Sequence, residues 1–295
     1  MTTEHPATLD PQRRHVLQTL VGTGFAAATL PISAQTIQTD TQGIQADAHF
    51  IPTFDGKLAA YVARPAKSNG PLPTVLVVSE IFGVHEYIKD VARRLAKQGY
   101  LAIAPELFTR QGDPSKISDI PTILKDVISK VPDEQVMKDL DACVAWAHGL
   151  AKTHGGTQGK NQRVGITGFC WGGRITWLYA AHNPNVTAAV AWYGRVTGAA
   201  TPLTPQHPVD VADKLHGPVL GLYGEKDTGI TLDTVEAMRS KLLAVAAKNP
   251  NAARSDIVVY PDAPHAFHAD YRPSYRAEAA KDGWEKLTAW FEKYL

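Results

Sequence analysis

Short apolar runs alternate with helical patterns along most of this 295-residue sequence, and this alternation constrains the fold more than any other feature. The run at 73–79 is continuously apolar between a proline and a serine, as expected of a strand buried on both faces. Residues 86–97 follow with apolar side chains at helical spacing, and Gly99 supplies a C-terminal stop. Strands that alternate with helices predict right-handed crossovers and a mostly parallel sheet covered on both sides.

The same alternation continues to the C-terminus. Asp55-Gly56, a strong hairpin turn pair, separates two strands expected between residues 46 and 65. No repeat or linker interrupts residues 46–295, so we expect one α/β catalytic domain. The further strands are predicted at 100–104, 163–167, 186–192, 218–223 and 256–260. A long loop after the first of these leads into helical segments that run to about residue 149, and further helices are predicted at 171–182, 232–247 and 275–295.

Composition excludes several classes of protein. The 30 basic and 29 acidic residues give a net charge of +1, which indicates neither nucleic-acid binding nor disorder. No apolar run in the main body approaches the roughly 18 residues that span a bilayer. Two cysteines exclude a disulfide framework. Cys143 lies in a helical apolar pattern and is interpreted as core, and its pairing with Cys170 is disfavoured because a disulfide needs close, specific geometry.

The first 35 residues differ from the rest of the chain. Arg13-Arg14 precedes a mildly apolar run over 20–32 that ends in small residues, a pattern that resembles a twin-arginine export signal. Residues 36–45 are predicted to form a polar linker. Export predicts a periplasmic protein, with no stable membrane insertion after signal removal. The alternative is an ordinary N-terminus with a chance arginine pair and a cytoplasmic protein.

The stretch Gly168-Phe-Cys-Trp-Gly-Gly173 joins a predicted strand to a predicted helix. In such a sheet, ligands gather beyond the carboxyl ends of the strands, where Cys170 stands. Flanking glycines suit a sharp turn, and the helix N-terminus favours a thiolate. Cys170 is therefore a candidate nucleophile, although the motif alone also fits a simple tight turn.

A nucleophile at such a turn needs a base, and the base needs an orienting acid, in the chain order nucleophile, acid, base. Asp227 follows the strand predicted at 218–223, and His265 follows the strand predicted at 256–260. Both therefore belong to the same sheet edge as Cys170. Glu225 is a weaker rival acid. His268 shares a loop with His265, but no ligand set accompanies them, so zinc is not expected.

Together these residues resemble the dienelactone hydrolases, a branch of the α/β-hydrolase fold, from about residue 46 to residue 295. The matching motifs are Glu-Ile-Phe-Gly at 80–83, Gly-Phe-Cys-Trp-Gly-Gly at 168–173, Gly-Glu-Lys-Asp at 224–227 and His-Ala-Phe at 265–267. The resemblance implies an α/β-hydrolase fold. It also implies a triad in which Cys170 is the nucleophile, His265 the general base and acid, and Asp227 the residue that orients His265.

The resemblance also implies an oxyanion hole from the backbone N–H groups of Trp171 and Ile81. Glu80 corresponds to the family's additional carboxylate, which interacts with the resting thiol and helps to deprotonate it. A Glu80 side chain that only caps the helix at 86–97 is the alternative.

The sequence departs from the family at Ala269, where members that cleave anionic dienelactone carry an arginine for the substrate carboxylate. Arg272 and Arg110 are candidate replacements. Phe82 and Tyr193, with other aromatic residues, are candidates to line an apolar pocket. Dienelactone itself is thus in doubt, whereas ester or lactone hydrolysis is not.

We therefore predict a thiol-dependent hydrolase of a small-molecule ester or lactone, working through a thioester and without a cofactor. A general carboxylesterase is the nearest alternative. A redox thiol protein would leave Asp227 and His265 unexplained, and a non-catalytic binding protein would be expected to lack a triad member. Neither the oligomeric state nor the particular substrate follows from the residues.

Overall fold

The computed structural model of the protein describes residues 36–68, 70–153 and 163–295. The predicted export segment at 1–35 lies outside the described residues, so export stays a prediction. Within the described part of the chain, no helix is long and apolar enough to cross a membrane.

One eight-stranded sheet organises the molecule, in the order β1-β2-β4-β3-β5-β6-β7-β8. The hairpin β1–β2 is antiparallel and β2 also pairs with β4 antiparallel, while the remaining neighbours are parallel. The predicted mostly parallel sheet is therefore confirmed. The strands are β1 (Ile44–Thr53), β2 (Gly56–Pro65), β3 (Thr74–Val78), β4 (Leu101–Pro105), β5 (Val164–Phe169), β6 (Val186–Trp192), β7 (Val219–Gly224) and β8 (Asp256–Tyr260).

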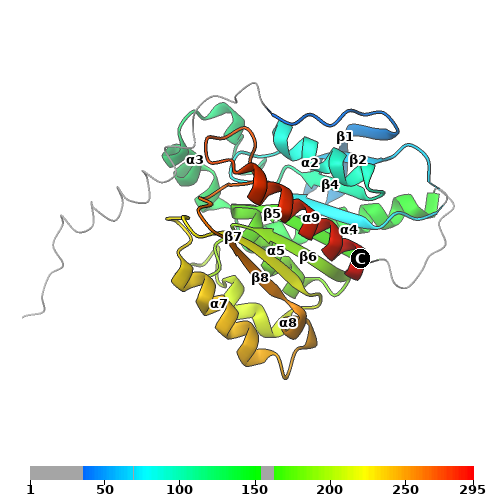
Figure 1. The fold of residues 1–295 in the computed structure, drawn as a ribbon. Helices are drawn as coiled ribbons and strands as arrows, with labels where there is room; N and C mark the ends of the chain where they lie inside the picture. Colours follow the sequence, from blue (N-terminus) through cyan, green and yellow to red (C-terminus); the bar gives the residue numbers. More distant parts are fainter. Residues whose placement is uncertain (1–35, 69, 154–162) are drawn as a thin grey trace, which may run out of the picture.

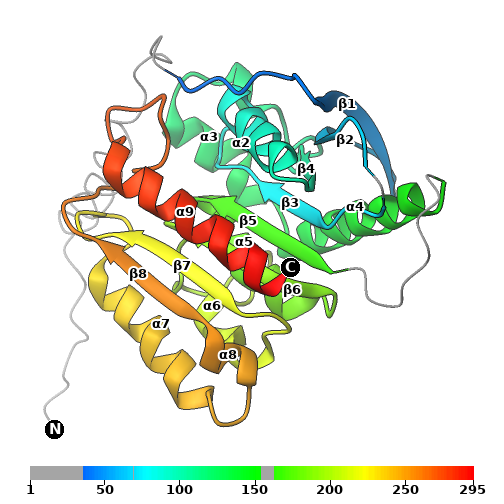
Figure 2. The same ribbon diagram turned by 45° about the vertical axis from the view of Figure 1, so that its right-hand side comes forward.

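Helices cover both faces of the sheet (Figure 1). The helices α2 (Glu86–Lys97) and α9 (Ala277–Tyr294) pack on one face, and Figure 2 shows α9 running across that face. On the other face lie α4 (Asp133–Thr153), α5 (Trp171–His182) and α7 (Leu232–Val245). All five residues of β3 are buried, which explains its unbroken apolar pattern.

The short helices are what the sequence patterns missed, because each has too few residues to show a periodicity. They are α6 (Pro208–Val211), α8 (Pro250–Arg254) and the 3₁₀ turns η1 (Pro114–Lys116) and η3 (Ala212–Lys214). The helix α3 (Ile120–Asp126) and the 3₁₀ turn η2 (Ile128–Lys130) fall in the region where helical segments were expected up to about residue 149. The helix α3 contributes to the wall of the pocket described below.

The segment expected to be a polar linker, 36–45, instead belongs to the folded unit. The strand β1 already begins at Ile44. Before it, the Thr39 N–H donates to Asp90 of α2 at 2.5 Å, and Asp40 pairs with Lys97 at 2.6 Å. Side chains from distant α2 supply these contacts, so the composition of the segment gave no sign of them.

Candidate active site

The predicted nucleophile stands at a sharp turn between β5 and α5. Cys170 has a φ of +56°, in the left-handed region that strains a residue with a side chain. A Cβ on Gly168 would lie 2.2 Å from the Gly172 carbonyl oxygen, and one on Gly172 would lie 2.3 Å from the Val78 oxygen. Only glycine fits at either position, and α5 therefore approaches β3 closely enough to hold the sulfur at the sheet edge.

Asp227 and His265 meet at the same edge, from the loops that follow β7 and β8. His265 Nδ1 donates to Asp227 Oδ2 at 2.6 Å. The other aspartate oxygen accepts from the N–H groups of Gly229 and Ile230, at 2.9 and 3.0 Å. Three donors thus lock the carboxylate, which is the geometry required to orient an imidazole.

The pKa of His265 depends on Cys170 as well as on Asp227. Burial alone would lower the pKa of the imidazole, but the Cys170 and Asp227 charges and hydrogen bonds with both outweigh it and raise the pKa to about 10. The raised pKa favours a protonated His265, held by Asp227 and lining the same pocket as Cys170.

The other residues considered as an acid or as metal ligands, Glu225 and His268, make different contacts. Glu225 is exposed and pairs with Lys226. His268 is buried, and its Nδ1 lies 2.5 Å from the hydroxyl of Tyr87 rather than beside His265. Among the described residues no group of histidine, cysteine or acidic side chains is arranged to hold a metal ion. Cys143 and Cys170 are both free thiols.

Glu80 lies at the end of β3 and is 1% exposed. Its Oε2 accepts from His85 Nε2 and from the hydroxyl of Tyr271, each at 2.9 Å, and Arg272 lies 3.9 Å from Oε1. Burial alone would raise the Glu80 pKa, but the Arg272 charge and the two hydrogen bonds lower it to about 2. The carboxylate is ionised, and its described hydrogen bonds go to side chains and not to backbone N–H groups of α2.

A pocket of about 250 Å³ opens beside the sulfur. The expected oxyanion-hole residues Ile81 and Trp171 line it, as does Tyr193, whose ring centroid lies 5.2 Å from that of His265. The other side chains of its wall are apolar or polar residues of the surrounding loops and helices, namely Leu124, Ile128, Ser129, Arg174, Arg195, Thr204, His207 and Ile230.

Two of the expected substrate contacts, Phe82 and Arg272, lie outside this lining. The Arg272 guanidinium carbon stands 4.7 Å from the centroid of the Phe82 ring, and its side chain is 4% exposed. With Glu80 beside it, Arg272 supports the carboxylate instead of facing the pocket.

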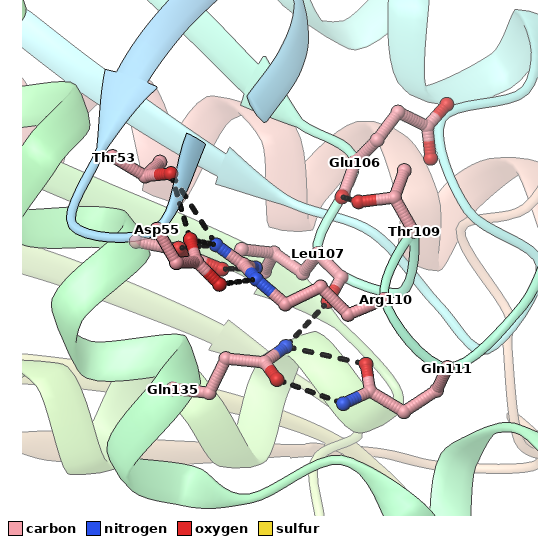
Figure 3. Close-up of polar contacts among 9 residues, drawn as sticks. Thr53, Asp55, Glu106, Leu107, Thr109, Arg110, Gln111 and Gln135 are labelled. Atoms are coloured by element: carbon pink, nitrogen blue, oxygen red, sulfur yellow. Dashed lines mark hydrogen bonds and ion pairs between the residues drawn. The ribbon is translucent and has the colours of Figure 1, made fainter. Parts of the chain in front are cut away.

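Arg110 is a clear departure from expectation. Figure 3 shows its guanidinium against Asp55 of the β1–β2 turn and Thr53 at the end of β1. The distances to Asp55 are 2.6 Å from both Nε and Nη2, and Nη1 donates to the buried Asp139 of α4 at 2.7 Å. Arg110 therefore ties the hairpin to α4 and is not a pocket residue. Both of its aspartate partners, Asp55 and Asp139, are distant in sequence, so no local pattern predicts these ion pairs.

Two arginines line the pocket, Arg174 and Arg195, and sequence reasoning missed Arg195, which lies just beyond β6. Arg174, also in the pocket wall, is neutralised by Asp133 through two contacts of 2.7 Å. Arg195 is exposed and has no carboxylate partner among the described residues. Its position two residues after Tyr193, at a strand end, is the signal that would have found it.

A cysteine on a strained strand-to-helix turn, followed in chain order by an aspartate and a histidine that hydrogen-bond each other, defines an α/β hydrolase on this fold. The family model for "Dienelactone hydrolase family" matches residues 58–295, most of the chain. The chain belongs to the dienelactone hydrolase family and is a hydrolase that acts on ester or lactone bonds.

Known proteins agree with this assignment. A protein of Methylorubrum extorquens provisionally named carboxymethylenebutenolidase is 58% identical over 283 residues, covering 96% of this chain and 93% of its own. A crystal structure of a provisionally assigned dienelactone hydrolase from Klebsiella pneumoniae shares 56% identity with a TM-score of 0.78, covering 85% of this chain and 99% of its own. A Bradyrhizobium protein, 32% identical over 86% of this chain and 97% of its own, is provisionally named a 2-oxo-3-(5-oxofuran-2-ylidene)propanoate lactonase.

Proposed function

We propose that the protein hydrolyses a small ester or lactone through a covalent thioester on Cys170. The contact chain that carries the proposal runs from Cys170 through His265 to Asp227, with the His265–Asp227 hydrogen bond at 2.6 Å. The strained backbone of Cys170 and its place in the pocket wall support the same role.

The first half-reaction forms the thioester. The thiol proton passes to His265, and the sulfur attacks the carbonyl carbon to give a tetrahedral oxyanion. Backbone N–H groups of Trp171 and Ile81 are the proposed donors to this oxygen, a contribution of roughly 3 kcal/mol for each donor. The C–O bond to the leaving oxygen then breaks, and His265 returns its proton to that oxygen. A lactone opens at this step and its hydroxyl end stays attached.

The second half-reaction releases the acid. His265 takes a proton from a water molecule, which attacks the thioester carbonyl, and the carbon–sulfur bond breaks as the thiol regains its proton. Every proton is carried by the protein or by water, so the cycle needs no cofactor. A thiolate is a better leaving group than an alkoxide, which makes the thioester accessible from esters and lactones more readily than from amides. A general carboxylesterase would use the same steps on a different substrate.

For the substrate we propose an apolar acyl portion that carries an anionic group. Ile81, Ile128 and Ile230 supply the apolar wall, and Arg195 supplies a positive charge that pairs with no carboxylate of the described residues. The propanoate in the name of the Bradyrhizobium relative is a group of this kind. Arg195 would then bind the substrate carboxylate from the end of β6, in place of the family arginine that Ala269 replaces in the loop after His265.

The test is hydrolysis of a panel containing dienelactone, simple lactones and short aryl esters, by the wild type and by Cys170→Ala. We expect activity on at least one compound to fall by about 10⁴-fold or more in the variant, since the nucleophile and the covalent intermediate are both lost. Mass spectrometry of the wild type, quenched during turnover, should show a mass increase equal to the acyl group on Cys170.

Equal rates in the two proteins would contradict the thiol mechanism. No hydrolysis of any ester or lactone by a folded wild type would favour the redox or binding alternatives instead. Reduction of hydrogen peroxide that depends on Cys170 would then separate those two alternatives.

A further inference from the structure

The loop between β6 and α6 supplies four residues of the pocket wall, namely Tyr193, Arg195, Thr204 and His207. None of them belongs to the triad, and Arg195 is the proposed partner of the substrate carboxylate. Residues 193–207, all within the described chain, form no helix or strand. The shape of this loop therefore depends on its side chains and on the helices beside it.

His207, the last residue of the loop, joins the two ends of the loop to each other. Its ring lies against Gly198, where a Cβ would come within 2.5 Å of Cε1 and 2.7 Å of Nε2 of the ring. Nε2 lies 3.2 Å from the Ala199 carbonyl oxygen, and the residue is 5% exposed. One buried side chain thus connects the end of the loop to the segment that follows Arg195.

The contacts of the His207 ring fix its orientation and its tautomer. Arg174 Nε, which only donates, lies 3.4 Å from His207 Nδ1, so the ring proton is on Nε2 and is donated to Ala199. The His207 backbone N–H donates to Asp210 Oδ2 at 2.8 Å. Because both ring nitrogens have protein partners, this geometry suits a residue that holds the loop, not one that exchanges a proton with substrate.

Backbone contacts complete the same arrangement. The Val209 N–H donates to the Val196 carbonyl at 3.1 Å, so residues 196–199 are held by residues 207–209. Farther along the loop, Arg174 Nη2 donates to the Gln206 carbonyl at 2.7 Å and the Asp133 N–H to the Leu203 carbonyl at 2.9 Å. Arg195 enters the pocket wall directly before the segment that His207 holds.

We propose that His207 is a positioning residue that sets substrate specificity: by holding residues 198–199 it keeps Arg195 at the pocket wall, where a substrate carboxylate binds. The inference rests on the proposed function, in particular on the role of Arg195, and adds the residue that fixes its position. The triad comes from other loops, so His207 acts on which substrate is bound and not on the chemical steps.

The test is the KM of a matched pair of esters, one with a carboxylate and one neutral, for the full-length wild type and His207→Ala. We expect the ratio of the two KM values, carboxylate over neutral, to rise roughly fivefold, the equivalent of one lost hydrogen bond. The change is expected in KM for the carboxylate ester rather than in kcat, because Cys170, Asp227 and His265 do not belong to this loop.

Gly198 allows the same contact to be disturbed from its other side. Gly198→Ala places a Cβ against the His207 ring, and the three heavy atoms nearest to that Cβ all belong to the ring. We expect Gly198→Ala to raise the KM ratio as His207→Ala does. In the double variant the Cβ meets the space that the ring has left, so the two effects should not add.

Two conservative variants separate the contacts of the ring. His207→Gln keeps an N–H donor that reaches Ala199 and should recover most of the wild-type ratio. His207→Asn keeps an acceptor for Arg174 but is too short to reach Ala199, and it should resemble His207→Ala. The matched control is His216→Ala, an exposed histidine before β7, whose ratio should equal that of the wild type. Thermal unfolding of every variant, measured in parallel, shows whether it is folded.

A ratio that rises in Arg195→Ala but not in folded His207→Ala would overturn the inference alone. Fully additive effects of Gly198→Ala and His207→Ala would also overturn it, because the two residues would then not act through one contact. A ratio that changes in neither Arg195→Ala nor His207→Ala would remove Arg195 from substrate binding, and the inference with it.

Failure of the proposed thiol mechanism looks different, because Cys170→Ala would then keep hydrolysing both esters while the KM ratio still reports the loop. If the folded wild type hydrolyses neither ester, the rates of Cys170 alkylation by anionic iodoacetate and neutral iodoacetamide replace the two KM values. Cys143 is fully buried and does not compete. The preference for iodoacetate should fall in His207→Ala and in Gly198→Ala, and an unchanged preference would overturn the inference.

Discussion

At the scale of single residues, charge pairing decides which arginine is free to meet a substrate. Arg110 is bound by Asp55 and Asp139, and Arg174 by Asp133, so neither presents an uncompensated charge. Arg195 is exposed at the pocket wall without such a partner in the described chain. A carboxylate on the substrate would gain a charge-assisted hydrogen bond there.

Arg195→Ala is expected to raise KM about tenfold for a substrate that carries a carboxylate, relative to the KM for a neutral ester of similar size, since one charge-assisted hydrogen bond is lost. Initial-rate kinetics on the matched pair of esters measure this ratio. Arg254→Ala, which removes an exposed arginine at the end of α8, is the control. An unchanged ratio in Arg195→Ala would remove this residue from substrate binding.

At the scale of elements, the pocket depends on how α5 is held against its neighbours. Gly172 lets α5 touch β3, and at the first turn of the helix Arg174 forms a two-contact ion pair with Asp133 at the start of α4. Both partners are largely buried, at 7% and 13% side-chain exposure. Breaking such a pair leaves a charge in the protein with no compensation.

Asp133→Ala should therefore lower the free energy of unfolding by roughly 3 kcal/mol, because Arg174 would remain buried and unpaired. Urea denaturation followed by fluorescence measures the change. The control is Glu134→Ala, the adjacent residue, whose pair with Lys138 is exposed and should contribute little. Equal unfolding midpoints for the two variants would show that the α4–α5 pair does not support the fold.

At the scale of the whole molecule, a buried histidine links stability to pH. His268 packs among Trp192, Phe169 and Trp284. Burial, with the Arg94 charge, lowers its pKa to about 3. In the unfolded chain His268 binds a proton near pH 6.5, whereas in the folded protein it stays neutral until about pH 3. The free energy of unfolding therefore falls as the pH drops from 6.5 toward 3.

By pH 4 this one group should cost on the order of 3 kcal/mol of folding free energy relative to pH 7. Glu80, whose pKa is lowered, adds a loss only below its ordinary value of 4.5. Unfolding midpoints in urea at pH 7, 6.5, 5.5, 4.5 and 4 measure the dependence. In His268→Phe, which keeps a ring in the stack but cannot titrate, the decline between pH 6.5 and 4.5 should be much smaller. A decline of the same size would assign the acid sensitivity to other groups.

Local chemistry allowed much of this molecule to be predicted from its residues. The strand and helix order followed from apolar periodicity, and the turn at Cys170 from its glycines, because both signals act between near neighbours in the chain. Asp227 and His265 were identified because parallel strands bring their carboxyl ends to one edge, so chain order predicts which loops meet. The contact that joins them, across 38 residues, follows the same rule.

Tertiary structure alone decided which side chains complete the site. Tyr271 reaches Glu80 from 191 residues away, and Asp133 neutralises Arg174 from 41 residues away. Arg110 and Arg195 carry the same side chain. Their neighbours in the folded chain decide that Arg110 joins the β1–β2 hairpin to α4 and that Arg195 places a positive charge at the pocket. Periodicity and turn motifs report short-range geometry, whereas charge pairing and burial depend on packing between segments far apart in the sequence.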